Sequence, residues 1–240
     1  LMAAGIDIPR KVFAHGWLLV GGEKMSKSKL TGIAPSDITD HFGVDAFRYY
    51  FLRAIPFGSD GSFSWEDMSA RYTSELANDF GNLASRLAAM IEKYCGGKIP
   101  AVAKDATLAQ SLQETVEKAD KAMVALDFQG GINAVMDYCK QVNGFVTIKE
   151  PWILAKDPAN QAVLEEVLYN TAESLRALAV LLHPVMPATT EILWESLGAK
   201  ASLGEIGKQE ISKVATWGQL PQGATVTKTP VLFPRLEVKE

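Results

Sequence analysis

Cysteine and histidine are scarce in this chain, which has 240 residues but only two cysteines and three histidines. The cysteines, Cys95 and Cys139, lie far apart, and neither has another cysteine or a histidine at the spacing of a metal site. This pattern argues against a zinc site within the chain. Such sparse cysteine usage is typical of a reducing compartment, so we expect a cytoplasmic protein.

Long apolar runs and an excess of positive charge are also missing. No uninterrupted apolar stretch reaches the ~18 residues that a membrane span needs, and the N-terminus lacks the layout of a signal peptide. The net charge is −4 and the sequence pI is about 5.5, so no overall basic field attracts nucleic acid. Any contact with a polyanion must therefore be local.

The apolar pattern predicts a short α/β piece at the beginning of the chain. We expect a buried strand around Val12–Phe13, a second at Trp17–Val20, a helix from Pro35 to a break at Gly43, and a helix over Val44–Ala54. Ser36 or Asp37 is the expected N-cap of the first helix, and "FGSDGSFSW" (57–65) is interpreted as turns. Two strands are too few to bury a sheet, so this piece is expected to be the end of a domain.

Helices are predicted for most of the remaining chain. Ser64 and Asp67 resemble a capping box for one long helix from Trp65 to Tyr94, with apolar residues every three or four positions. Further helices are expected near 107–125, 128–149, 159–182 and 187–197, followed by a tail packed on the bundle. The expected fold is mainly α, a helical bundle after the remnant of a Rossmann-type α/β domain. Its expected divisions are 1–35, 36–64 and 65–240.

A lysine-rich loop, "VGGEKMSKSKLTG" (20–32), is the local exception to the acidic composition. It places three lysines within six residues, with two serines among them and glycines on both sides. A mobile loop of this kind can bring positive charge to a triphosphate and withdraw it again. A solvated lysine-rich turn is the alternative, and on charge alone it is favoured.

The string "KMSKS" at Lys24–Ser28 resembles the second signature of class I aminoacyl-tRNA synthetases. Its setting, "HGWLLVGGEKMSKSKL" and then "FGVDAFRYYFL", is similar to that family as well. The resemblance implies that Lys24 and Lys27 stabilise the triphosphate of ATP, carried with Mg²⁺, during formation of an amino-acid adenylate. It implies an ATP site made by His15, Gly16, Lys24, Met25, Ser26, Lys27 and Ser28. For His15, a turn residue satisfied by the backbone is an equal alternative.

Three further segments resemble the methionyl members of the family: Ser59 to Arg86, "KEPWILAK" (149–156) and "LFPRLE" (232–237). The resemblance implies that Asn82, Arg86 and Trp152 recognise the CAU anticodon of tRNA(Met), with the tryptophan stacked on its first base. An asparagine can read a base edge, an arginine can fork onto a base or phosphate, and a tryptophan can stack on an unpaired base.

Each of these three residues also has a structural alternative. Asn82 can be a surface helix residue, Arg86 can pair with Glu75, Asp79 or Asp137, and Trp152 can be core. Pro151 is expected to disrupt a helix beside Trp152. Asp45, Arg48 and Tyr49, in the link between the two regions, are interpreted as mostly structural, with Arg48 a candidate for contact with the tRNA stem.

The family's first ATP signature, methionine pocket and zinc knuckle have no counterpart in this sequence. We therefore expect the C-terminal portion of a methionyl-tRNA synthetase, without adenylate formation by this chain alone. Methionine, ATP and tRNA(Met) are the expected partners of the full enzyme, with no membrane contact; the residues do not decide the oligomeric state, and a monomer is the expectation. The alternative is a non-catalytic tRNA- or RNA-binding module with a synthetase-like bundle.

Overall fold

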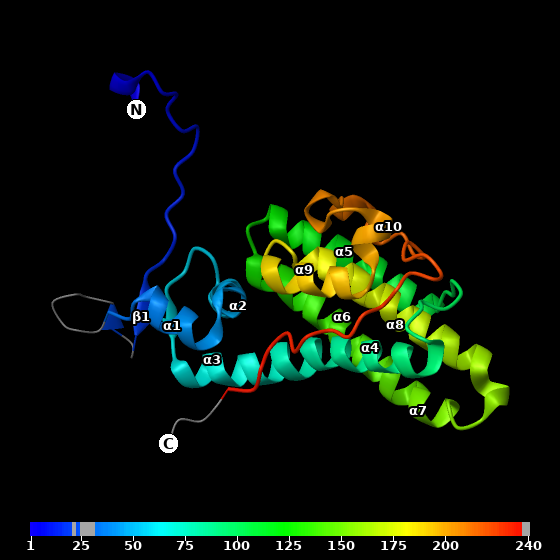
Figure 1. The fold of residues 1–240 in the computed structure, drawn as a ribbon. Coiled ribbons are helices and arrows are strands. Elements are labelled where there is room, and N and C mark those ends of the chain that lie inside the picture. The colour runs from blue at the N-terminus through cyan, green and yellow to red at the C-terminus, as the bar shows by residue number, and fades with distance from the viewer. Residues whose placement is uncertain (21–22, 25–31, 237–240) are drawn as a thin grey trace.

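The computed structural model describes residues 1–20, 23–24 and 32–236 (Figure 1). A small sheet with two short helices leads into a long helix, and the long helix runs along a bundle made by the rest of the chain. The first residues, including the short 3-10 turn η1 (Met2–Ala4), extend away from this body and are exposed.

The sheet has three short strands, β1 (Leu18–Val20), β2 (Glu23–Lys24) and β3 (Gly61–Phe63), in the order β2-β1-β3. Strand β2 is antiparallel to β1, and β3 is parallel to it. The prediction of a strand around Val12–Phe13 is wrong. Both edges of β1 are already paired, and Val12 is 85% exposed.

Strand β3 lies within the segment interpreted as turns, so that interpretation is wrong for Gly61–Phe63. Close packing selects glycine at its first residue. A Cβ on Gly61 would lie 2.3 Å from a side-chain carbon of Ile55, at the end of the preceding helix.

Helices α1 (Pro35–Phe42) and α2 (Val44–Ala54) follow the strands and are separated by Gly43, whose φ of 84° ends α1. The expected N-cap of α1 is wrong, because Ala34 caps the helix and Pro35 is its first residue. Asp37 instead reaches back, and its Oδ2 accepts a hydrogen bond from the Ala34 amide at 3.0 Å. Proline suits this first position because it has no N–H to leave unpaired.

The long helix is continuous but not uniform. It consists of α3 (Trp65–Arg71), a π-helix η2 (Tyr72–Gly81) and α4 (Asn82–Cys95). Ser64 caps it as predicted, since its Oγ accepts a hydrogen bond from the Asp67 amide at 3.1 Å. The predicted apolar stripe is buried from Met68 to Ile91.

The bundle contains the remaining helices, α5 to α10, with the longest, α6 and α8, near its centre. Every residue of α8 from Val167 to Leu182 is buried, as expected for a helix surrounded by others. The bounds are α5 (Ala106–Val124), α6 (Phe128–Lys149), α7 (Pro151–Leu154), α8 (Gln161–Leu182), α9 (Pro187–Ser196) and α10 (Ala199–Leu203). Short 3-10 turns lie at Pro158–Asn160, Ile206–Lys208 and Ile211–Lys213.

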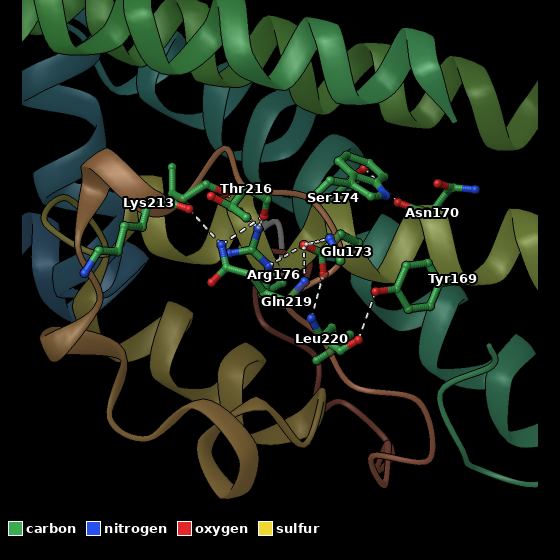
Figure 2. A network of polar contacts seen from close by, with 12 residues as sticks. Tyr169, Asn170, Glu173, Ser174, Arg176, Lys213, Thr216, Gln219 and Leu220 are labelled. Carbon is green, nitrogen blue, oxygen red and sulfur yellow. Dashed lines mark hydrogen bonds and ion pairs between the residues drawn. The ribbon is translucent and has the colours of Figure 1, made fainter. Parts of the chain in front are cut away.

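A buried ion pair on α8 anchors the tail that follows the helices (Figure 2). Arg176 Nε lies 2.9 Å from Glu173 Oε1, and both side chains are at most 1% exposed. Both side chains also form hydrogen bonds with the backbone of the tail. Glu173 accepts hydrogen bonds from the amides of residues 218–220, and Arg176 donates one to the Val214 carbonyl. The prediction of a tail packed on the bundle is thereby confirmed.

Candidate functional site

Arg86 and Trp152, predicted from the sequence to act together, are in contact. The guanidinium carbon of Arg86 lies 5.4 Å from the centroid of the Trp152 ring, which is a cation–π arrangement. Both residues are partly buried. The contact joins α4, which carries Arg86, to the short helix α7, which carries Trp152.

Pairing of Arg86 with a carboxylate is not observed in the described part of the chain. Glu75 accepts from Arg53 and Arg71, and Asp137 lies near Lys140. Asp79 contributes no ion pair among the described residues either. The predicted structural alternative for Arg86 is therefore wrong, and its planar charge is held against an aromatic face instead.

The chain turns sharply before Trp152, and the turn explains how the ring is placed. Helix α6 ends at Lys149, and Glu150 adopts a left-handed conformation with φ of 45°. Pro151 then begins α7, so the helix is interrupted beside Trp152 as expected. A proline is well suited to the first turn of a helix, and the break falls one residue earlier, at Glu150.

Asn82 lies one turn before Arg86 and is exposed. It lines a pocket of about 240 Å³ that lies between the long helix and the C-terminal tail. The tail contributes Leu232, Phe233 and Arg235 to the lining. Sequence reasoning connected "LFPRLE" with the family but did not foresee that it lies beside Asn82.

The tail is fixed there by contacts with Tyr72 on the π-helix. Tyr72 donates a hydrogen bond from its hydroxyl to the Pro234 carbonyl at 2.8 Å. Its ring packs edge-on against Phe233, with centroids 5.7 Å apart. Asn82 therefore has the tail on one side and the Arg86–Trp152 contact one turn further along α4.

His15 and Gly16 lie at the other end of the molecule, beside an apolar pocket of about 260 Å³. His15 donates from Nδ1 to the Gly16 carbonyl at 2.8 Å, which is the backbone-satisfied arrangement considered as its alternative. Gly16 is required sterically, since a Cβ there would lie 2.1 Å from the Ser59 carbonyl carbon. Their part in an ATP site stays a prediction.

The lysine-rich loop falls mostly outside the described residues. Lys24 belongs to β2, where its backbone is opposite Leu19 of β1. Met25, Ser26, Lys27 and Ser28 lie outside the described ranges. Their predicted roles therefore remain expectations from the sequence.

The link between the two regions is held by polar contacts from α2. Asp45 Oδ2 accepts a hydrogen bond from the Thr189 amide at 2.6 Å and so caps α9. Arg48 donates to the carbonyls of Val185 and Pro184, at 2.9 and 2.7 Å. Tyr49 donates from its hydroxyl to Glu75. These contacts are the structural roles predicted for the three residues.

Of the two cysteines, Cys139 is buried and Cys95 is partly buried. Burial raises the pKa of the Cys95 thiol to about 11 and that of the Cys139 thiol to about 12. Within residues 1–20, 23–24 and 32–236, no group of three or more His, Cys, Asp or Glu side chains could hold a metal ion. The described helices include none that is long and apolar enough to cross a membrane.

Comparison with known proteins gives two family matches. Residues 1–88 match a family described as tRNA synthetases class I (M), and residues 105–222 match one described as the anticodon-binding domain of tRNA ligase.

Curated relatives align with the whole chain. The chain is 61% identical to a methionine–tRNA ligase of Streptomyces coelicolor, over 46% of that protein, and 42% identical to one of Halalkalibacterium halodurans, over 36% of it. It therefore spans less than half the length of these relatives.

Solved structures agree with the curated relatives. A methionyl-tRNA synthetase of Mycobacterium tuberculosis in complex with methionyl-adenylate matches 98% of the chain with a TM-score of 0.84 and 33% identity. The match covers 46% of that structure. The apo form of the enzyme matches with a TM-score of 0.81.

Proposed function

Because the chain belongs to the class I aminoacyl-tRNA synthetases, we propose that it is the part of a methionine–tRNA ligase that reads the CAU anticodon of tRNA(Met). The observation that carries this proposal is the contact between Arg86 and Trp152, with Asn82 one turn away on the same helix. These residues bring a base-reading amide, a charged fork and an aromatic face to one region.

The contact suits recognition of an unpaired nucleotide. The Trp152 ring packs against the hydrophobic core but is partly exposed, so its exposed part can receive a base beside Arg86. Asn82 is exposed and has both a donor and an acceptor for a base edge. Asn82, Arg86 and Trp152 are accordingly the proposed anticodon-binding residues.

The reaction belongs to the full ligase and is part of the proposal. The enzyme would use ATP to activate methionine and then transfer it to tRNA(Met). Lys24 and Lys27 would stabilise the triphosphate, with Mg²⁺ carried by the phosphates. His15, Gly16, Met25, Ser26 and Ser28 would complete this part of the ATP site. Residues 1–35 would end the catalytic domain, 36–64 would connect it, and 65–240 would form the anticodon-binding domain.

The proposal includes cytoplasmic localisation, since translation takes place in the cytoplasm. It also includes a monomeric state. A non-catalytic RNA-binding module is not favoured, because the synthetase family match covers residues 1–88 as well as the bundle.

The test is a binding titration with an anticodon stem-loop carrying CAU, at a stated salt concentration. Trp152→Ala is expected to weaken binding by about 1–3 kcal/mol, the usual worth of base–aromatic stacking. Ile153→Ala, on the exposed side of the same short helix, is the matched control and should bind like the wild type. Equal binding by wild type and Trp152→Ala would contradict the proposal.

A further inference from the structure

The segment directly before Asn82 has unusual helical geometry. Residues Tyr72–Gly81 form a π-helix, and the Asn82 amide donates to the Ala77 carbonyl, five residues back. The change from π to α geometry therefore falls at the first residue of α4. Short π-helical segments inside α-helices occur frequently at functional sites.

The register of this segment decides where Asn82 and Arg86 point. Each residue of an α-helix turns the chain by about 100° and advances it by ~1.5 Å. A shift of one residue in the π-helix would therefore rotate all of α4 relative to α3. Asn82 would leave the tail pocket and Arg86 would leave Trp152, so this register has to be fixed by contacts with neighbouring elements.

Asn143 of α6 makes such a contact with Asp79, which lies three residues before Asn82. Its Nδ2 donates one hydrogen bond to the Asp79 carbonyl of the π-helix at 3.0 Å. The same Nδ2 also donates to the Cys139 carbonyl, one turn back on α6, at 3.1 Å. The side chain is partly buried where α6 packs against the π-helix.

The same helix α6 also leads to Trp152. It ends at Lys149, and one residue separates it from α7. A contact from Asn143 to Asp79 therefore connects the helix that carries Asn82 and Arg86 to the helix that places the Trp152 ring.

We propose that Asn143 is a positioning residue for anticodon reading: its bond to the Asp79 carbonyl fixes the π-helix in the register that aims Asn82 and Arg86. The inference rests on the proposed function, because positioning requires a ligand to be read. Asn143 itself is not placed in contact with RNA.

The sharpest variant is Asn143→Ser. A serine on a helix can still bond the carbonyl four residues back, so the bond within α6 can be kept while the longer reach to Asp79 is lost. Asn143→Ala, which loses both bonds, is the second variant. Thr147→Ala is the matched control, since Thr147 Oγ1 donates to the Asn143 carbonyl at 2.9 Å and its loss removes a bond within α6 alone.

Two readouts separate positioning from general stability. The first is discrimination, the ratio of affinities for a CAU hairpin and for the same hairpin with one anticodon base changed. Asn143→Ser should reduce this ratio roughly three- to tenfold, the range for loss of one hydrogen bond, while Thr147→Ala leaves it unchanged. The second is amide hydrogen exchange over residues 77–86, which should become faster in Asn143→Ser without RNA present.

Asn82→Ala supplies the coupling test. If Asn143 acts through Asn82, adding Asn143→Ser to Asn82→Ala should reduce discrimination by less than the same change does in the wild type.

If both Asn143 variants discriminate between the hairpins and exchange their amide hydrogens as the wild type does, the inference is overturned and the proposed function still stands. A wild-type chain that does not distinguish the hairpins would overturn the proposed function, and this role for Asn143 with it. Faster exchange alone in that case would show a structural contact only.

Discussion

The guanidinium of Arg86 lies over the ring of Trp152, 5.4 Å from its centroid, although 66 positions separate the two residues in the sequence. Because both residues are only partly buried, this cation–π contact is worth about 1 kcal/mol, and its main consequence is geometric. It keeps a planar charge and an aromatic face together on adjacent helices.

Replacement of Arg86 should therefore affect RNA binding more than folding. Arg86→Met keeps much of the apolar stem but removes the charged fork. We expect the free energy of unfolding to fall by less than about 1 kcal/mol, while binding of a CAU hairpin weakens by more than that. Urea unfolding and hairpin titration on the same preparation provide the comparison. A variant that loses stability but binds normally would show that the contact only supports the fold.

The buried pair of Glu173 and Arg176 leads to a strong prediction for stability. Glu173→Gln would leave the Arg176 guanidinium buried without its counter-charge. Removing one partner of a buried pair typically costs about 3–5 kcal/mol. The control is Glu210→Gln in the exposed pair with Lys213, where we expect a loss of about 1 kcal/mol or less. Similar urea midpoints for the two variants would contradict this assignment of the pair as the anchor of the tail.

Asp45 supplies a cap to α9 from a different helix. Met186, the residue before that helix, gives no side-chain cap, and the Thr189 amide donates to Asp45 instead. Asp45→Ala should lower the free energy of unfolding by about 1–2 kcal/mol, as the loss of an N-cap usually does. Asp45→Asn keeps an oxygen acceptor and should lose less. Equal losses in the two variants would mean that the negative charge, and not the hydrogen bond, stabilises the helix end.

The buried thiol of Cys139 predicts a dependence of stability on pH. Burial raises its pKa from an ordinary value of 9.0 to about 12 in the folded chain. Above pH 9 the unfolded chain loses this proton while the folded chain keeps it, so ionisation favours unfolding. The contribution of the protonated Cys139 thiol to the free energy of unfolding is complete below pH 9 and is lost as the pH rises toward 12.

Urea unfolding at pH 7, 9 and 10 provides the measurement, with Cys139→Ala as the comparison. The wild type should lose stability between pH 9 and 10, and the variant should lose less over the same interval. Parallel pH profiles for the two proteins would show that Cys139 does not contribute.

Local signals in the sequence account for much of the fold. Gly43 separates α1 from α2, which has its predicted bounds, and Ser64 begins the long helix as expected. Strand β3 was missed because its three residues pair with β1, more than forty positions earlier, and only that distant partner makes them a strand.

The π-helix leaves only an ambiguous signal in the sequence. Met68, Tyr72, Leu76 and Phe80 follow one another at a constant spacing of four, and all are buried. A regular α-helix needs spacings of three among those of four to keep one face, because it has 3.6 residues per turn. A constant spacing of four lies between the α-helical turn and the wider π-helical turn, so by itself it does not distinguish the two.

The candidate site was only partly predictable. Asn82, Arg86 and Trp152 came from resemblance to a family, and no local rule indicates that Arg86 lies over Trp152. The hydrogen bond from Asn143 to the Asp79 carbonyl depends on how α6 crosses the π-helix, and a backbone acceptor leaves no mark in the sequence.

The most direct test of the central claim is whether this chain reads anticodon bases and not only phosphates. Two hairpins, one with CAU and one with a single anticodon base changed, would be titrated with the wild-type chain at several fixed salt concentrations. Phosphate contacts give the logarithm of the affinity a linear dependence on the logarithm of the salt concentration. We predict two parallel lines with the CAU hairpin bound roughly tenfold more tightly throughout, the upper range for one lost hydrogen bond. Two coincident lines would contradict the claim, because the chain would then recognise charge alone.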